Sequence, residues 1–155
     1  MTRSLLMLMS TSAALIISSI SFAASTACID KVRSDTGYNN ERAATACGRA
    51  SVACIDKVRS DTGYNNERAA TACSAGATVE CIEKIRSDTG YNNERAAKAC
   101  GRATVSCIEK VRSDAGYNYE RAATACSGGA TVPCIEKVRS DAGYNNVRAA
   151  EACSE

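Results

Sequence analysis

The stretch CIDKVRSDTGYNNERAATAC, residues 28–47, decides the fold because the chain repeats it along most of its length. The same letters return at 54–73, and three near-copies begin at Cys81, Cys107 and Cys134. The copies start 26, 27, 26 and 27 residues apart, and self-similarity at such a period is typical of repeat architectures. The connectors alternate in step, with six residues in GRASVA and GRATVS and seven in SAGATVE and SGGATVP. This alternation indicates that a pair of copies was the unit duplicated.

Each copy is predicted to form two short helices that meet at a glycine. In the second copy, apolar residues recur every three positions within 52–61, which places them on one face of a first helix. Gly63 follows as a left-handed stop. Asn65 is then the expected cap of a second helix over NERAATAC, which is rich in good helix formers. The residues expected to cap first helices are Ser51, Thr78, Thr104 and Thr131, and Pro133 suits a first turn.

The hairpin predicts how the ten cysteines pair. Cys54 and Cys73 lie at nearly equal distances before and after Gly63, so folding the chain there brings them together at the open end. A rival scheme joins copies across the connectors, as in Cys47–Cys54, but it leaves the first and last cysteines without a partner. Each staple within a copy closes a loop worth about 3 kcal/mol in the loop-entropy estimate. The predicted pairs are Cys28–Cys47, Cys54–Cys73, Cys81–Cys100, Cys107–Cys126 and Cys134–Cys153.

The predicted fold class is therefore all-α: a tandem array of five short disulfide-stapled α-hairpins, stacked as a small solenoid. The chain has no Trp and one Phe, so its core must come from Ile, Val, Ala, Tyr and cystine. Such a thin core needs covalent help, and stacking would bury the apolar faces that single hairpins leave exposed. The domain is expected to cover 24–155, with repeats at about 24–48, 50–74, 77–101, 103–127 and 130–154.

Residues 1–23 predict a secretory signal peptide, with Arg3 before an apolar run and cleavage expected after Ala23. Serine and threonine interrupt that run, so it lacks the roughly 20 apolar residues of a membrane span, and no transmembrane segment is expected in the mature chain. The even cysteine count favours a secreted or periplasmic protein in an oxidising compartment. Removing Arg3 leaves a nearly balanced charge, which argues against nucleic acid as a partner.

The sequence offers little to support catalysis or metal binding. It has no histidine and no C-x-x-C, and its cysteines lack the close pairing of zinc sites. The loop DTGYNNE resembles a calcium loop only faintly, because its glycine is third and no distant bidentate glutamate follows. We therefore expect no cofactor, no metal site and no catalytic residue, and enzymatic activity is the least favoured hypothesis for the function.

Repetition itself is the functional clue, since equal copies suit equal contacts rather than one active site. The predicted function is an exported multivalent binding or structural scaffold whose partner is a protein or a cell-envelope surface. The alternative is a secreted, disulfide-stabilised effector, toxin or inhibitor. The sequence leaves the ligand and the oligomeric state open. The candidate ligand face consists of Tyr38, Tyr64, Tyr91, Tyr117, Tyr119, Tyr144, Arg42, Arg68, Arg95, Arg121 and Arg148.

Overall fold

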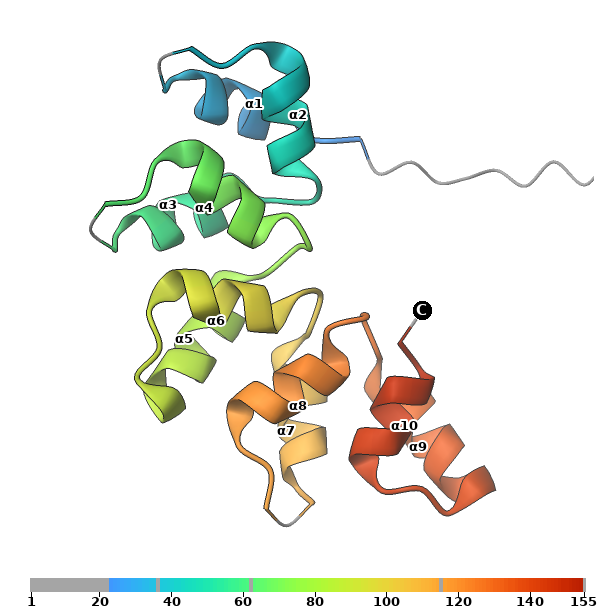
Figure 1. Ribbon diagram of the computed structural model, residues 1–155. Coiled ribbons are helices and arrows are strands. Elements are labelled where there is room, and N and C mark those ends of the chain that lie inside the picture. The colour runs from blue at the N-terminus through green and yellow to red at the C-terminus, as the bar shows by residue number, and fades with distance from the viewer. Residues whose placement is uncertain (1–22, 36, 62, 115, 155) are drawn as a thin grey trace, which may run out of the picture.

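The computed structural model describes residues 23–35, 37–61, 63–114 and 116–154, and within these it contains ten α-helices and no strand. The helices form five consecutive hairpins that follow one another along a curved path, α1–α2 at one end and α9–α10 at the other (Figure 1). This confirms the predicted all-α repeat array. The helices are α1 (Thr26–Arg33), α2 (Asn40–Cys47), α3 (Val52–Arg59), α4 (Asn66–Cys73), α5 (Val79–Thr89), α6 (Asn93–Cys100), α7 (Val105–Arg112), α8 (Tyr119–Cys126), α9 (Val132–Ala142) and α10 (Asn146–Ala152).

The predicted signal peptide lies outside the described residues, apart from Ala23. Among the helices that the structure describes, none is long and apolar enough to cross a bilayer.

Local capping sets where the helices begin. Every first helix starts after a Ser or Thr whose hydroxyl accepts a hydrogen bond from the backbone N–H of the repeat's first cysteine, as Ser51 does from Cys54 at 3.1 Å. Every second helix starts after an Asn whose side chain accepts from an arginine N–H, as Asn65 does from Arg68 at 2.8 Å. These caps satisfy backbone donors that a helix start leaves free. The predicted caps of both kinds are confirmed.

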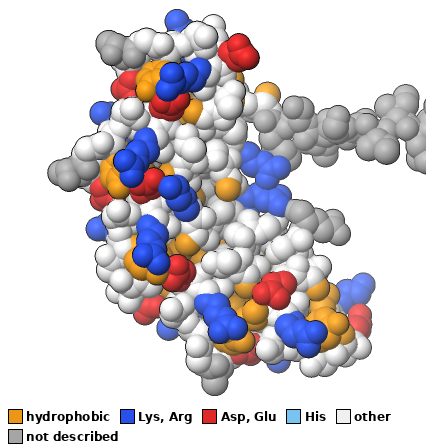
Figure 2. All heavy atoms as spheres, in the orientation of Figure 1, with side chains coloured by type: hydrophobic (Ala, Val, Ile, Leu, Met, Phe, Trp, Pro, Cys, Tyr) orange, Lys and Arg blue, Asp and Glu red, His pale blue; other side chains and the backbone are white. Residues whose placement is uncertain are grey.

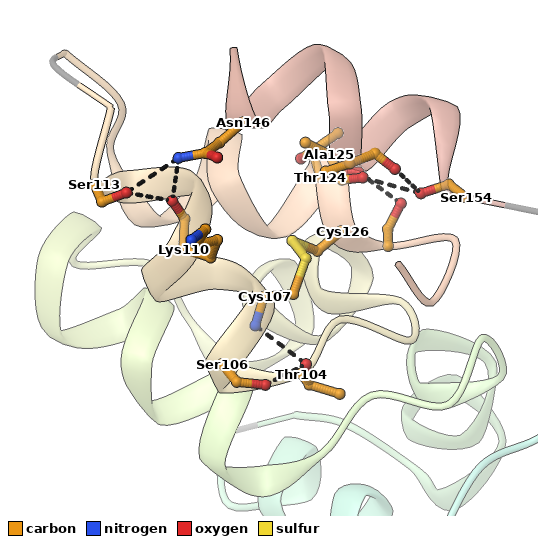
Figure 3. The surroundings of a disulfide bond; sticks show 12 residues. Thr104, Ser106, Cys107, Lys110, Ser113, Thr124, Ala125, Cys126, Asn146 and Ser154 are labelled. Carbon is orange, nitrogen blue, oxygen red and sulfur yellow. Dashed lines mark hydrogen bonds between the residues drawn. A yellow bond between two sulfur atoms is a disulfide. The ribbon is translucent and has the colours of Figure 1, made fainter. Parts of the chain in front are cut away.

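The five disulfides close the hairpins at their open ends, in the pairing that the hairpin requires. Their Cα atoms lie 6.0–6.1 Å apart, a usual separation for a cystine. Figure 3 shows the fourth, Cys107–Cys126, between α7 and α8. No cysteine of the described residues is free.

A single hydrophobic core runs through all five repeats. First helices contribute isoleucines such as Ile82 and Ile108, which are fully buried. Second helices contribute pairs of alanines such as Ala96 and Ala97, also fully buried, which let the neighbouring helix come close. Each second helix contacts the second helix of the next repeat, from α2–α4 to α8–α10. The hairpins therefore stack, and the thin apolar composition is used as one continuous core.

The alternating connectors correspond to two backbone geometries. In the six-residue connectors, Arg49 and Arg102 donate their backbone N–H to carbonyls of the following repeat, at Ser74 and Ser127. Both kinds of connector also turn back on their own repeat, since Ala50 donates to the carbonyl of Cys47 at 2.7 Å and Gly76 donates to that of Cys73 at 2.8 Å. The period of 26 and 27 residues thus reflects two kinds of junction between otherwise similar hairpins.

The ends of the first helices differ from the prediction. The second copy was expected to be helical over 52–61, up to the stop at Gly63, but α3 ends at Arg59. Only α5 and α9 continue to a glycine, Gly90 and Gly143, which caps them in the left-handed conformation with φ of +67° and +65°.

The cause is a buried asparagine in the next repeat. Asn66 is 2% exposed, and its side-chain amide donates to the carbonyl of Lys31 at 2.7 Å and to Ser34 Oγ at 3.0 Å. It also donates to Asp35 Oδ1 at 3.0 Å, while its backbone N–H donates to Asp35 Oδ2. We call this arrangement the asparagine clamp; Asn93 and Asn146 form the same clamp on α3 and α7. Figure 3 shows Asn146 reaching Lys110 and Ser113.

The clamp correlates with helix length throughout the array. The three clamped helices, α1, α3 and α7, all end at an arginine after eight residues. The helix α5 faces Tyr119 where a clamping asparagine would stand, and no described repeat packs on the end of α9; both helices reach eleven residues. The clamp holds the serine and aspartate that follow the arginine in a turn, so a clamped first helix stops early.

Candidate functional site

The predicted ligand face is a row of arginines stacked on tyrosines. In each repeat, the guanidinium of the second-helix arginine lies over the tyrosine ring of the same repeat's loop, 3.7–4.7 Å from its centroid. These distances are within the range of a cation–π contact. Figure 2 shows basic side chains beside hydrophobic and acidic ones along the array. The stacked pairs are Tyr38–Arg42, Tyr64–Arg68, Tyr91–Arg95, Tyr117–Arg121 and Tyr144–Arg148.

Three of these arginines also bridge to the next repeat. Each pairs with the glutamate in the first turn of the following second helix, and we call each set of tyrosine, arginine and glutamate a strut. Arg42 binds Glu67 at 2.6 Å, Arg68 binds Glu94 at 2.8 Å and Arg95 lies 3.7 Å from Glu120. The third strut is longest because Tyr91 also donates its hydroxyl to Glu120 at 2.5 Å. The struts join neighbouring repeats, and the role of these residues as a ligand face stays a prediction.

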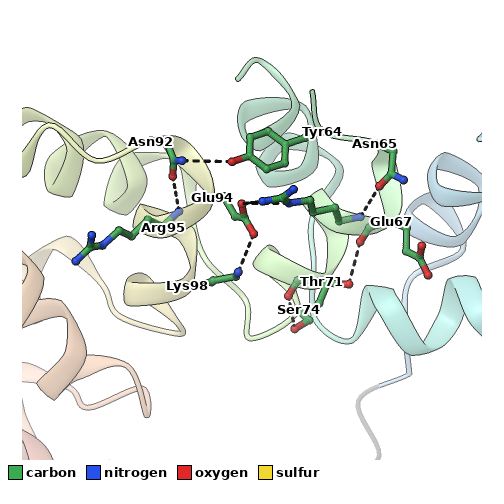
Figure 4. A network of polar contacts seen from close by, with 10 residues as sticks. Tyr64, Asn65, Glu67, Thr71, Ser74, Asn92, Glu94, Arg95 and Lys98 are labelled. Atoms are coloured by element: carbon green, nitrogen blue, oxygen red, sulfur yellow. Dashed lines mark hydrogen bonds and ion pairs between the residues drawn. The ribbon is translucent and has the colours of Figure 1, made fainter. Parts of the chain in front are cut away.

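Two of the struts lower the pKa of their carboxylates. Hydrogen bonds from Arg68 and then Lys98 lower the pKa of Glu94 to about 2. The hydrogen bond from Arg42 likewise lowers the pKa of Glu67. Glu94 stands out because it is 8% exposed and accepts from both cations, as Figure 4 shows. These carboxylates are held ionised in the folded chain.

The fourth junction lacks a strut. Val147 occupies the position that Glu67, Glu94 and Glu120 hold in the other repeats. No carboxylate of the described residues pairs with Arg121, which lies over the ring of Tyr117 at 4.5 Å. Val147 is 6% exposed. The fourth junction is thus apolar where its counterparts are ionic.

Tyr119 does not belong to the tyrosine row. It stands at the clamp position of the fourth repeat, and its ring lies between Arg112 at 3.6 Å and Lys84 at 4.8 Å. Its hydroxyl faces Glu109 Oε1 at 3.4 Å. Tyr119 therefore replaces the asparagine clamp by an aromatic contact between two cations.

Equivalent pockets open between successive second helices at three of the junctions. They have volumes of about 420, 460 and 540 Å³ at the first, second and fourth junctions. The second is edged by Arg68 and by Asn65, Thr71, Glu94 and Lys98, the last four of which are labelled in Figure 4. The others are edged by the corresponding residues of their own repeats, with Val147 in place of the glutamate at the fourth junction. The pockets repeat with the array and have mixed charge.

A second row of ion pairs joins the first helices. A lysine of each of the first four of these helices binds the carboxylate two residues after the next repeat's first cysteine, at 2.5–2.7 Å. The partners in these pairs were not identified from the sequence. The recurrence of lysine and carboxylate at a spacing of 25–26 residues is the signal that could have found them. The pairs are Lys31–Asp56, Lys57–Glu83, Lys84–Glu109 and Lys110–Glu136.

In the part of the chain that the structure describes, no three His, Cys, Asp or Glu residues are grouped to hold a metal ion. Seven of the nine ion pairs among the described residues instead join neighbouring repeats.

Comparison with protein-family models, with curated proteins and with solved structures finds no match for this chain.

Proposed function

We propose that the chain is an exported scaffold that binds a protein or cell-envelope surface carrying repeated groups. The observation that carries the proposal is the recurrence of one pocket type at the first, second and fourth junctions. A ligand that offers the same group at regular intervals could occupy several of these pockets at once. The five cystines fit an oxidising compartment and support the exported location.

Each pocket alone is suited to weak binding. Its edge is polar and carries both charges, as with Arg68 and Glu94 at the second junction. Exposed ionic contacts of this kind contribute little individually. Affinity would come from engaging several pockets together, since the second and later contacts are intramolecular.

The scaffold holds its pockets at a fixed spacing. Cystines close every hairpin, and ion pairs cross every junction at the first helices. Rigidity of this kind lowers the entropy lost on binding. The proposal assigns no catalytic role, which agrees with a surface built from repeated equivalent contacts.

The test compares chains with different numbers of repeats. Removing residues 81–133 deletes two whole repeats and keeps the alternation of six- and seven-residue connectors. Binding of the purified, oxidised chain to isolated cell envelopes would be measured by co-sedimentation. We expect the affinity of the three-repeat chain to be at least about tenfold weaker than that of the five-repeat chain. Equal affinity of the two chains would contradict a multivalent scaffold.

The fourth junction favours a second candidate, a secreted effector or inhibitor that acts through one site. The pocket at the fourth junction shares its place and its arginine with the other two, but Val147 replaces the glutamate that pairs with the arginine there, which leaves Arg121 without that ion pair. Replacing Arg121 by alanine would then abolish binding, whereas Arg68→Ala at the second junction would not. A scaffold predicts similar, partial losses from both variants.

A further inference from the structure

The contacts that join neighbouring repeats follow one pattern inside the array. At the first junction, α4 contacts both α1 and α2, and Ile55 and Ala70 of the second repeat become fully buried. Two ion pairs and the asparagine clamp flank this apolar contact. Each junction therefore combines an apolar centre with charges of opposite sign on its two sides.

The first repeat presents the same surface, and no described residue of another repeat covers it. Ile29 and Ala44 are partly exposed, whereas their counterparts in all four later repeats are buried. Asn40 is exposed, although its counterpart Asn66 is buried in a clamp. We call this surface the N-terminal face.

The last repeat presents the other half of a junction. Val138 is partly exposed, while the residues at its position in the four earlier repeats are fully buried. Ala152 is exposed, as are Ser140 and Asp141, which correspond to the clamp acceptors Ser34 and Asp35. We call this surface the C-terminal face.

The two faces carry opposite charges. Asp30 and Glu41 on the N-terminal face are exposed and form no ion pair with any described residue. Lys137 and Arg148 on the C-terminal face are likewise exposed and make no ion pair with the described part of the chain. Inside the array these positions pair with each other across every junction but the fourth, where Val147 interrupts one row.

The end repeats keep most of the residues of an interior repeat, although Thr26 stands where the later repeats have Val52, Val79, Val105 and Val132. Terminal repeats commonly replace their outer apolar positions by polar ones, which prevents stacking. Here the first copy, 28–47, is identical to the second, 54–73, so the residues of 28–47 on the N-terminal face are those that an interior repeat buries. The C-terminal face also keeps the residues of the first repeat: Lys137, Val138, Ser140, Asp141 and Arg148 match Lys31, Val32, Ser34, Asp35 and Arg42.

We propose that the chain binds a second copy of itself head to tail, with the C-terminal face of one molecule on the N-terminal face of the next. Lys137 would pair with Asp30 and Arg148 with Glu41 of the neighbouring copy. Asn40 would clamp the end of α9. Because the two faces differ, the contact is heterologous and leaves both outer ends free to bind further copies. This assembly goes beyond the proposed scaffold function and does not depend on it.

The clamp supplies a structural signature of the contact. The helix α9 runs to Ala142, whereas the clamped helices end at the arginine three residues earlier. Assembly would place Asn40 of the next copy on α9 and shorten it to Arg139. The serine after the arginine keeps helical angles in the clamped helices, so backbone chemical shifts at 141–142 should lose their helical values as protein concentration rises.

Charge reversal tests the proposal by sedimentation velocity. Wild-type protein should sediment faster as its concentration rises, and less so at high salt, because exposed charges are screened. One variant carries Lys137→Glu with Arg148→Glu; the other carries Asp30→Lys with Glu41→Arg. Each variant alone presents like charges at the contact, and we expect its association to weaken at least about tenfold.

The decisive measurement is the sedimentation of the two variants mixed together. The reversed face of each is complementary to the reversed face of the other, and the remaining faces keep their normal match. We expect the mixture to assemble again as alternating oligomers, which also shows that both variants are folded. Arg59→Glu, away from both faces, should assemble as the wild type does. A wild type that stays monomeric up to its solubility limit, or assembly that both variants retain alone, would overturn the proposal.

Discussion

Glu94 is the carboxylate most constrained by its surroundings. Arg68 of the preceding repeat donates to one of its oxygens at 2.8 Å, and Lys98 of its own helix donates to the other at 2.7 Å. Its side chain is 11% exposed, against 23% and 33% for Glu67 and Glu120 in the other struts. A carboxylate buried to this degree needs its charge paired, so Glu94 connects the second and third repeats in a way that depends on ionisation.

We predict that Glu94 contributes a part of the stability that disappears in acid. Its pKa is about 2 in the folded chain, below the value of about 4.3 expected for an unfolded glutamate. The contribution is therefore complete above the unfolded pKa and is lost as pH falls from about 5 towards 2. Urea unfolding of the oxidised protein across this range should show a smaller loss of stability for Glu94→Gln than for the wild type.

Glu41→Gln is the matched control for that measurement. Glu41 occupies the same position in the first repeat but is exposed and has no ion pair among the described residues. Its replacement should leave the wild-type dependence of stability on pH unchanged. If the free energy of unfolding falls equally with decreasing pH in the wild type and in Glu94→Gln, the strut does not stabilise the junction.

Neighbouring residues differ in how far sequence alone could predict them. Asn65 could be identified as a cap because its partner, the N–H of Arg68, is three residues away. Asn66 could not be identified as a clamp, since its acceptors lie 31–35 residues earlier and meet it only when the hairpins stack. The same holds for Arg68 and Glu94, which are 26 residues apart. Local capping and hairpin pairing were predictable, and contacts that depend on the stacking angle were not.

At the scale of elements, a first helix begins by its own sequence and ends by its neighbour's. The segments VRSDTG and IRSDTG are nearly the same at the ends of α3 and α5, yet α3 stops at Arg59 and α5 continues to Thr89. What differs is the following repeat, which presents Asn93 to α3 and Tyr119 to α5. This explains why the expected extent of the first helix was correct for two repeats and too long for three.

We predict that Tyr119→Asn shortens α5 to Arg86. The new asparagine would supply the clamp at the one interior junction that lacks it, and Asp88 already accepts a hydrogen bond from the backbone N–H of residue 119 at 3.1 Å. Nuclear magnetic resonance chemical shifts should lose their helical values at 88–89, while Ser87 keeps the helical angles of its counterparts in the clamped helices. The added hydrogen bonds should raise the free energy of unfolding by about 1 kcal/mol, less whatever the lost ring contacts contribute.

Tyr119→Phe is the control for this change. It keeps the ring between Lys84 and Arg112 and removes only the hydroxyl near Glu109. The helix α5 should keep its full length in this variant. A long α5 in the Tyr119→Asn protein would mean that the clamp accompanies the short helices without causing them.

On the scale of the whole molecule, stability depends on position along the array. Each hairpin contacts only its neighbours, so the array is expected to behave as a chain of linked units. The first two repeats and the last two contact the central repeat, α5–α6, but not each other, whereas the last repeat, α9–α10, contacts one neighbour. The same covalent change should therefore have different consequences at the two places.

Removing one cystine at the centre or at the end tests this dependence. Cys81→Ala with Cys100→Ala and Cys134→Ala with Cys153→Ala each open a loop of the same length, with a separation of 19 residues and an expected loss of about 3 kcal/mol in the repeat concerned. Loss at the end should fray α9 and α10 alone, leaving amide protection in the first four repeats unchanged. Loss at the centre should uncouple the flanking pairs, lower protection throughout and broaden the urea transition. If both variants instead unfold in one sharp transition with uniform loss of protection, the five repeats form a single cooperative unit, and the strength of their junctions exceeds that of any hairpin.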